Sequence, residues 1–162
     1  MEYEIRPLRE EERPLLEDFL YEAIFLPEGY TGELPRGILQ TDPKLSTTIR
    51  DFGTLPHDDC LVAEVEGAVI GAVWVRIAEE YGHMDDETPS FAISLYRPYR
   101  GRGIGTALMR RMLERLREKG YPRASLGVNK ENYALRMYEK LGFQIIGDGA
   151  DETEWLMVCP LG

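Results

Sequence analysis

Apolar residues recur along the chain with two different spacings, and each spacing predicts one kind of element. Short apolar runs rich in β-branched residues, some alternating with polar residues, predict strands. Apolar residues three and four positions apart predict helices. The strands are expected at residues 3–6, 61–65, 68–77, 90–95, 124–128, 143–146 and 154–158, and the long helices begin near Glu11, at Ile104 and at Asn132.

Glycine and proline mark the ends of these elements. Pro27 with Gly29 is expected to close the first helix, Gly120 the second and Gly142 the third. Glu66-Gly67 between two strands predicts a hairpin. Helices that alternate with strands cover both faces of a sheet, so the order predicts one layered domain of the α/β (α+β) class over residues 1–162.

Composition and charge narrow the class of protein. Hydrophobic residues make up 43% of the 162 and charged residues 30%, which is typical of a globular domain. A formal net charge of −10 argues against nucleic acid as a partner. It would attract a cationic or amine substrate, but a solvated acidic surface is the commoner reason for such a charge. No apolar run is long enough to span a membrane, and the charged stretch from Met1 to Glu12 is unlike a signal peptide, so we expect a cytoplasmic protein without a membrane partner. Cys60 and Cys159 lack metal-type spacing, which predicts buried free thiols and no metal site.

The most informative stretch follows the strand at 90–95. Gly101, Gly103 and Gly105 stand at alternate positions just before the second long helix. Glycines allow a tight turn and a close ligand, and a helix N-terminus offers unpaired N–H groups, so the stretch predicts a site for a phosphate-bearing ligand. A Walker loop is excluded because no lysine follows the last glycine. A dinucleotide fingerprint fits poorly because its third glycine would fall at Thr106 or Leu108.

The stretch resembles the acyl-CoA loop of the GNAT acetyltransferase superfamily, whose pattern is Arg or Gln, two residues, Gly, one residue, then Gly or Ala. Arg100, Gly103 and Gly105 match that pattern. A second, independent stretch, residues 128–143, resembles the other GNAT motif, with Asn132 before an alanine, an apolar pair that ends in tyrosine, and Gly-Phe at its end. The resemblance covers roughly residues 61–143.

This resemblance implies a mixed, mostly antiparallel sheet of about seven strands flanked by helices, with acetyl-CoA as co-substrate. Main-chain groups of the strand before the loop would hold the pantetheine arm, and the loop would hold the pyrophosphate. Asn132 would contact the pantetheine or the pyrophosphate side, and Tyr138 would lie near the sulfur. In the family a proline often stands where this chain has Arg97, with Pro98 after it. The implied cofactor-binding residues are Ile93, Ser94, Leu95, Arg100, Gly101, Arg102, Gly103, Ile104, Gly105, Thr106, Asn132 and Tyr138.

The resemblance also implies a reaction, transfer of an acetyl group from acetyl-CoA to a primary amine by direct attack. Tyr138 would protonate the leaving thiolate, and a backbone N–H at Leu95 would stabilise the oxyanion. Some family members use a carboxylate near the start of the strand before the loop as base, which here indicates Glu87, with Asp85, Asp86 and His83 behind it. A water relay would serve as well.

Several alternatives stay open at this point. Asn132 could be only a helix cap and Tyr138 only a core aromatic. The domain could bind CoA as a sensor without turnover, or bind nothing and act as an interaction module. The acceptor could be a small molecule or a protein or peptide amine, and a homodimer through the last strands is compatible with the sequence. The segment from Glu28 to His57, with apolar residues at helical spacing on both sides of Asp42-Pro43, is interpreted as the acceptor side.

Overall fold

The computed structural model describes residues 2–26 and 34–162, which fold around one sheet of seven strands. Their order across the sheet is β1-β2-β3-β4-β5-β7-β6, and every neighbouring pair is antiparallel except β4 and β5. The expected mixed, mostly antiparallel sheet is therefore confirmed. The strands are β1 (Glu4–Pro7), β2 (Asp59–Val65), β3 (Ala68–Arg76), β4 (Ser90–Leu95), β5 (Arg123–Asn129), β6 (Gln144–Asp148) and β7 (Glu154–Pro160).

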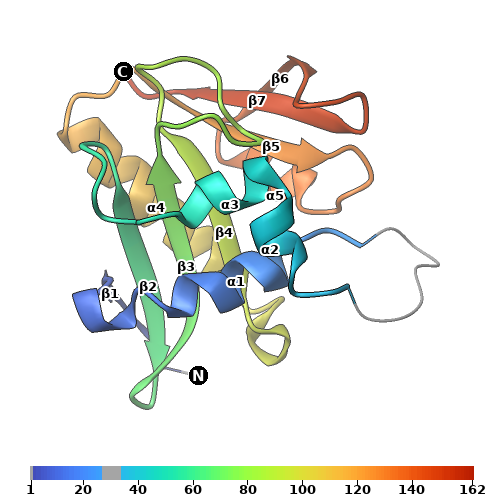
Figure 1. The fold of residues 1–162 in the computed structure, drawn as a ribbon. Helices are drawn as coiled ribbons and strands as arrows, with labels where there is room; N and C mark the ends of the chain where they lie inside the picture. The colour runs from blue at the N-terminus through green and yellow to red at the C-terminus, as the bar shows by residue number, and fades with distance from the viewer. Residues whose placement is uncertain (1, 27–33) are drawn as a thin grey trace.

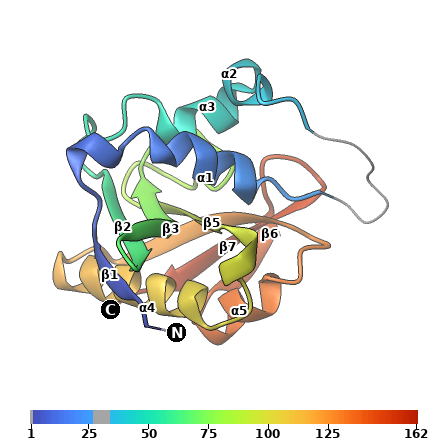
Figure 2. The same cartoon turned by 90° about the horizontal axis from the view of Figure 1, so that it is seen from below.

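Helices cover both faces of the sheet, as Figures 1 and 2 show. On one face lie α1 (Leu15–Ala23), α2 (Ile38–Thr41) and α3 (Pro43–Ile49), and on the other α4 (Ile104–Glu118) and α5 (Leu135–Lys140). Single 3-10 turns, η1 (Glu10–Glu12) and η2 (Arg97–Tyr99), precede α1 and α4. None of the helices in the described ranges is long and apolar enough to cross a membrane.

Alternation along the strands builds a separate core on each face. Cys60 and Val62 of β2 pack with α1 and α2, whereas Leu61 and Ala63 pack with α4. This is the period of two that a strand imposes on its side chains. Both cysteines are buried free thiols, as predicted.

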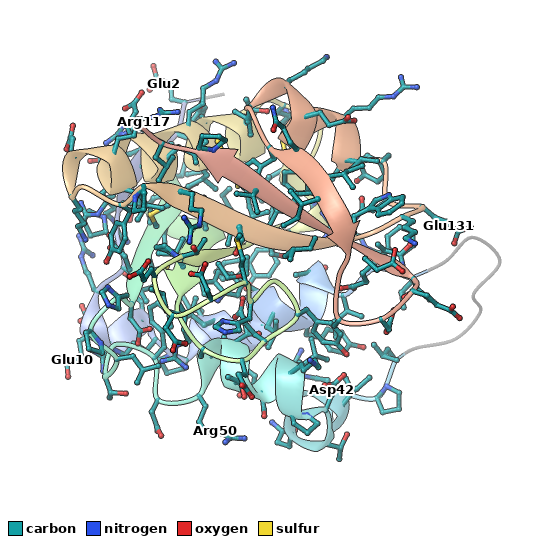
Figure 3. All side chains as sticks on the ribbon, turned by 90° about the horizontal axis from the view of Figure 1, so that it is seen from above. Glu2, Glu10, Asp42, Arg50, Arg117 and Glu131 are labelled. Atoms are coloured by element: carbon teal, nitrogen blue, oxygen red, sulfur yellow. The ribbon has the colours of Figure 1, made fainter. Side chains whose placement is uncertain are left out.

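The segment between α1 and β2 contains two short helices, as the apolar spacing predicted. Asp42 caps α3, since its Oδ1 accepts hydrogen bonds from the N–H groups of Lys44 at 3.0 Å and Leu45 at 3.3 Å, and Pro43 fits the first turn. Figure 3 shows Asp42 and Arg50 at the two ends of α3, on the side of the sheet opposite Arg117 of α4. Residues 27–33 of the predicted acceptor side lie outside the described residues.

Two predicted helix starts are wrong by three or four residues. Pro14 stands at the N-cap of α1, so this helix begins at Leu15 and Glu11 belongs to η1. The third long helix does not begin at Asn132, because the Asn132 Oδ1 accepts the Ala134 N–H at 2.9 Å and forms a local turn first. The helix itself, α5, starts at Leu135.

A buried ion pair fixes α3 to the sheet. Arg76 of β3 donates to both carboxylate oxygens of Asp58 at 2.8 Å, and also to the carbonyls of Thr47 and Arg50 at 2.9 and 2.6 Å. Burial alone would raise the pKa of Asp58, but its hydrogen bonds from Arg76 and two backbone N–H groups hold it below the usual value. The pair therefore holds the end of α3 in a fixed place.

We expect Asp58→Asn to lower the free energy of unfolding by about 3 kcal/mol, because it leaves the Arg76 charge buried without its counter-charge. Asp18→Asn is the matched control, since its partner Arg36 and Asp18 itself are about half exposed, at 50% and 48%. That change should cost less than about 1 kcal/mol. Urea unfolding of both variants measures this, and equal midpoints would contradict the structural role of the Arg76 pair.

Candidate active site

The sheet divides between β4 and β5. These parallel strands pair only through Ser90 with Ser125 and Phe91 with Leu126. Figure 1 shows them diverging beyond this point, and within the described residues positions 92–95 have no strand partner on the β5 side. An unpaired strand edge can hydrogen-bond to an amide-bearing ligand. The divergence therefore provides a place for such a ligand between the two strands.

The glycine loop stands at the end of this gap. Gly101 and Gly103 have φ of 74° and 84°, the left-handed region that favours glycine, and a Cβ on either would meet no atom within 4 Å. The first N–H of α4 with a backbone acceptor is that of Ala107, which bonds to the Gly103 carbonyl at 3.1 Å. The N–H groups of residues 104–106 have no backbone acceptor among the described residues. An open loop and free N–H groups at the start of a long helix suit a phosphate.

The two arginines of the loop have different surroundings. Arg100 donates through Nε to the Leu95 carbonyl at 2.9 Å and through Nη2 to the Glu22 carbonyl at 3.3 Å, and its Nη2 lies 3.4 Å from Glu22 Oε2. Arg102 is exposed and donates to the Pro98 carbonyl at 3.2 Å. Arg100 therefore ties the loop to the end of β4 and to α1, whereas Arg102 makes its hydrogen bond within the loop region.

A cavity of about 480 Å³ runs between the loop, β4 and α5. Ser94, which contributes to its wall, is only 6% exposed, and its Oγ has no hydrogen-bond partner in the part of the chain that the structure describes. Of the predicted cofactor-binding residues, Arg102 and the core residue Ile104 do not line it. The predicted residues that do are Ile93, Ser94, Leu95, Arg100, Gly101, Gly103, Gly105, Thr106, Asn132 and Tyr138.

Tyr138 of α5 also lines this cavity, which we call the groove beside the glycine loop. It is 9% exposed, and its ring packs edge-on against Phe143 with ring centroids 6.2 Å apart. Burial raises the pKa of Tyr138 to about 12. Its hydroxyl is therefore protonated throughout the neutral range and can donate a proton or a hydrogen bond.

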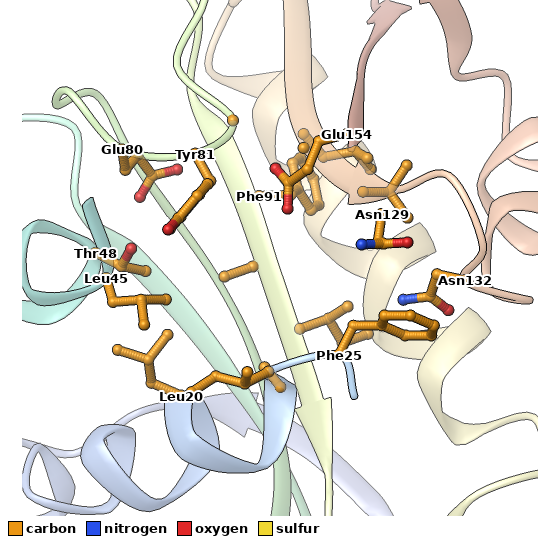
Figure 4. Close-up of a pocket in the computed structure, with 18 of the residues that line it drawn as sticks. Leu20, Phe25, Leu45, Thr48, Glu80, Tyr81, Phe91, Asn129, Asn132 and Glu154 are labelled. Atoms are coloured by element: carbon orange, nitrogen blue, oxygen red, sulfur yellow. The ribbon is translucent and has the colours of Figure 1, made fainter. Parts of the chain in front are cut away.

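A second cavity, of about 320 Å³, opens from the same place toward α2 and α3 (Figure 4). The residues common to both cavities are few: residues 23–25 at the end of α1, Ile93, Asn132 and Tyr138. Two ligands bound in the two cavities would meet at these residues. Tyr138 and Asn132 thus lie where a group could pass from one ligand to the other.

Comparison with known proteins agrees with this geometry. The model of the acetyltransferase (GNAT) family matches residues 23–143, from the end of α1 to the residue before β6. The chain belongs to the GNAT family. Sequence relatives include the mycothiol acetyltransferase of Brachybacterium faecium, 33% identical over 91 residues, and an acetyltransferase of Sodalis glossinidius, 35% identical over 94 residues. Each match takes in 56% of this chain but only 27% and 62% of the respective relative, less than two thirds of either.

Solved structures resemble the whole fold of this GNAT domain. The PaiA N-acetyltransferase of Thermoplasma acidophilum in complex with coenzyme A superimposes with a TM-score of 0.71 at 20% identity, covering 99% of both chains. The putative acetyltransferase YncA of Salmonella typhimurium with acetyl-CoA gives 0.70 at 18% identity, covering 100% of this chain and 95% of that one. At these identities the likeness establishes the fold.

The floor of the second cavity in this GNAT protein depends on two glycines. A Cβ on Gly82 would lie 2.7 Å from Gly127 N, and one on Gly127 would lie 2.8 Å from the Tyr81 carbonyl oxygen. Ser125 Oγ donates to the Gly82 carbonyl at 2.7 Å and fixes the contact. The loop after β3 therefore lies directly on β5, which places Glu80 and Tyr81 in the cavity wall.

Two glutamates of this cavity have unusual environments. Glu80 is 6% exposed, and burial raises its pKa to about 7. Glu154, the first residue of β7, also has its pKa raised to about 7, first by burial and then by the negative charges of Asp151 and Asp42. The Glu154 Oε1 is buried without a hydrogen-bond partner among the described residues. Figure 4 shows both carboxyl groups on the cavity wall, Glu154 near Asn129 and Glu80 beside Tyr81.

The sequence-predicted base lies elsewhere. Glu87 is exposed and lines neither cavity, and its N–H donates to Asp85 Oδ1 at 2.9 Å. Asp85 pairs with Arg123 at 2.6 Å, and Asp86 lies 4.0 Å from His83. The structure thus does not bring these residues together with Tyr138. Sequence reasoning missed Glu80 and Glu154. The only signal for them is that Glu154 begins an apolar strand and Glu80 follows another by four residues.

Proposed function

We propose that this protein transfers an acetyl group from acetyl-CoA to a primary amine, by direct attack in a ternary complex. The observation that carries the proposal is that Tyr138 stands where the groove beside the glycine loop meets a second, acidic cavity. Membership of the GNAT family and the names of the relatives support the reaction class.

In this proposal the co-substrate lies in the first groove. Its pyrophosphate accepts hydrogen bonds from the free N–H groups of residues 104–106, and the left-handed Gly101 and Gly103 leave room for it. Its pantetheine amides pair with the open edge of β4 at residues 93–95, where the unpartnered Ser94 hydroxyl offers a further hydrogen bond. Arg100 acts as a positioning residue, because its hydrogen bonds hold the loop against β4.

The acceptor amine lies in the second cavity and must lose a proton before it can attack, since alkylammonium groups titrate near pH 10. Glu154 takes that proton in our proposal, because its Oε1 is unpartnered, it lines the cavity, and it pairs in the sheet with Asn129 near the junction. The nitrogen then forms a bond to the thioester carbon. In this proposal the Leu95 N–H, on the open edge of β4, stabilises the oxyanion.

Collapse of the adduct breaks the carbon–sulfur bond. Tyr138 gives its proton to the sulfur as CoA leaves, and the remaining proton of the former amine restores the tyrosine hydroxyl by way of water. The products are an amide, CoA thiol and one proton. With a pKa near 12, Tyr138 is a weak proton donor to a thiolate. We therefore expect it to accelerate the reaction less than most general acids do.

The proposal is tested by incubating the protein with acetyl-CoA and a panel of primary amines while free thiol is followed. Cys60 and Cys159 are buried and give little background. We expect thiol release that depends on the amine. A protein that is stabilised by CoA against heat but releases no thiol with any amine would instead be a binding module.

A pH profile tests the base. We expect Glu154→Gln to lower kcat/KM roughly tenfold between pH 7 and 9, where Glu154 is ionised and the amine is still protonated. The deficit should shrink below pH 7, where Glu154 itself is protonated, and near pH 10, where the amine is neutral without help. Glu87→Gln is the matched control outside both cavities. A deficit that does not vary with pH would assign Glu154 a structural role.

A further inference from the structure

The second cavity carries more negative charge than one amine requires. Four acidic side chains line it, from three separate parts of the chain: Asp42, Glu80, Asp151 and Glu154. Asp42 and Asp151 are close enough to raise the pKa of Glu154, so the charges act on one another. In residues 2–26 and 34–162 none of the four lies within 4 Å of a lysine, arginine or histidine nitrogen, whereas Glu12, Asp58, Asp59 and Asp85 each do. Lys44, which acts weakly on Glu154, is exposed.

Two of these four acids, Asp42 and Asp151, accept hydrogen bonds from protein groups. Asp42 caps α3 through Oδ1 and accepts the Tyr81 hydroxyl through Oδ2. Asp151 accepts two hydrogen bonds from Thr153. The hydrogen bonds from Thr153 lower the pKa of Asp151, because they stabilise its charged form.

Glu80 makes no ion pair within the described residues, and only 6% of it is exposed. The Ser90 and Thr48 hydroxyls and the charge of Arg76 act to lower its pKa, but burial outweighs them and raises the pKa to about 7. A buried carboxyl without a counter-charge is costly unless a ligand supplies one.

Glu80 and Glu154 stand at different ends of the cavity. Glu154 lies opposite Asn129 in the sheet. The Asn129 carbonyl accepts the Asn132 N–H at 2.9 Å, and Asn132 lines the cavity beside the glycine loop. Glu154 is therefore at the end of the second cavity that faces this junction. Glu80 lies on the other side of Tyr81, toward Thr48 of α3 (Figure 4). A ligand that reaches from the junction to Glu80 therefore passes two carboxyl groups in turn.

We infer that the acceptor is a small aliphatic amine with a second positive charge, whose reacting nitrogen lies at Glu154 and whose other cation pairs with Glu80. This inference rests on the proposed function. The cavity volume of about 320 Å³ is at the lower end for small-molecule sites, which suits a short diamine rather than a folded protein chain. Leu20, Leu45 and Phe91 in the wall suit the methylene groups between the two charges.

The test compares three acceptors of equal chain length. They are pentane-1,5-diamine, pentylamine and 5-aminopentanoic acid. We expect kcat/KM for the diamine to exceed that for pentylamine about tenfold, since hydrogen bonds to charged groups contribute on that scale, and the amino acid to be the poorest. Glu80→Gln should reduce the preference for the diamine to less than threefold. Glu87→Gln, outside the cavity, should retain it.

Binding of the same compounds to the CoA-saturated wild-type protein, measured by titration calorimetry, separates this inference from the proposed function. Acetylation of pentylamine and the diamine with equal kcat/KM overturns the inference and leaves the function. If the diamine binds more tightly than pentylamine but no thiol is released, the proposed acetyl transfer is wrong. The inference that the second cavity selects ligands with two positive charges is then supported. A diamine preference that persists unchanged in Glu80→Gln excludes Glu80 as the second contact.

Discussion

Replacing Gly103 with glutamate is expected to abolish the binding of acetyl-CoA. Gly103 has φ of 84° and faces open space at the N-terminus of α4, so the new side chain enters the place where we put the pyrophosphate. Its carboxylate would also take up the free N–H groups and repel the phosphates. At a concentration 100 times its dissociation constant, a ligand stabilises the fold by about 2.7 kcal/mol. Melting curves with and without acetyl-CoA should show this gain in the wild type and none in the variant.

The chain offers a matched control for that experiment. Gly67, in the turn between β2 and β3, also has φ of 84° and open space around it, but it lines neither cavity. Gly67→Glu therefore imposes similar backbone strain and the same charge, and it should keep the full shift with acetyl-CoA. If Gly103→Glu were stabilised as much as Gly67→Glu, the loop would not be the phosphate site.

The second large effect is expected for Tyr138→Phe, which should lower kcat roughly 10- to 100-fold. The variant keeps the ring that packs against Phe143, so folding should be nearly unchanged. Only the proton donor is lost. The dissociation constant of acetyl-CoA should change by less than about threefold, which is under 1 kcal/mol.

Steady-state kinetics and a binding titration on the same preparation measure both quantities. Tyr3→Phe, at the far end of the chain and 39% exposed, serves as the control for loss of a tyrosine hydroxyl. Wild-type turnover in Tyr138→Phe would show that Tyr138 is only a core aromatic and that water protonates the thiolate. Loss of acetyl-CoA binding would make it a structural wall of the groove.

The groove beside the glycine loop could be predicted from the sequence, because it is built from short continuous stretches. Gly101 and Gly103 need a left-handed backbone that glycine adopts freely, and they stand directly before an apolar-periodic helix. The divergence of β4 from β5 could not be predicted from a local pattern, because residues 90–95 and 123–129 are far apart in the sequence.

The acidic cavity could not be predicted in this way, because it joins α1, the loop after β3 and the start of β7. Glu80 and Glu87 lie in one polar connection, and both resemble solvated loop residues in the sequence. What distinguishes them is the contact of Gly82 with Gly127, which holds this loop against β5, with Glu80 buried and Glu87 exposed. That contact joins residues more than forty positions apart, and neither glycine stands in a recognised motif.

The central claim is that the acetyl group passes directly from acetyl-CoA to an amine at the junction of the two cavities. A single-turnover experiment tests it most directly: the protein in excess is mixed with acetyl-CoA labelled in the acetyl group and with pentanediamine, quenched at short times, and analysed by mass spectrometry of both protein and small molecules. The account predicts that the label moves from CoA to the diamine at the rate of thiol release, with no labelled protein at any time. Label on the protein before it reaches the amine, or label that stays on CoA while the amine is bound, would contradict it.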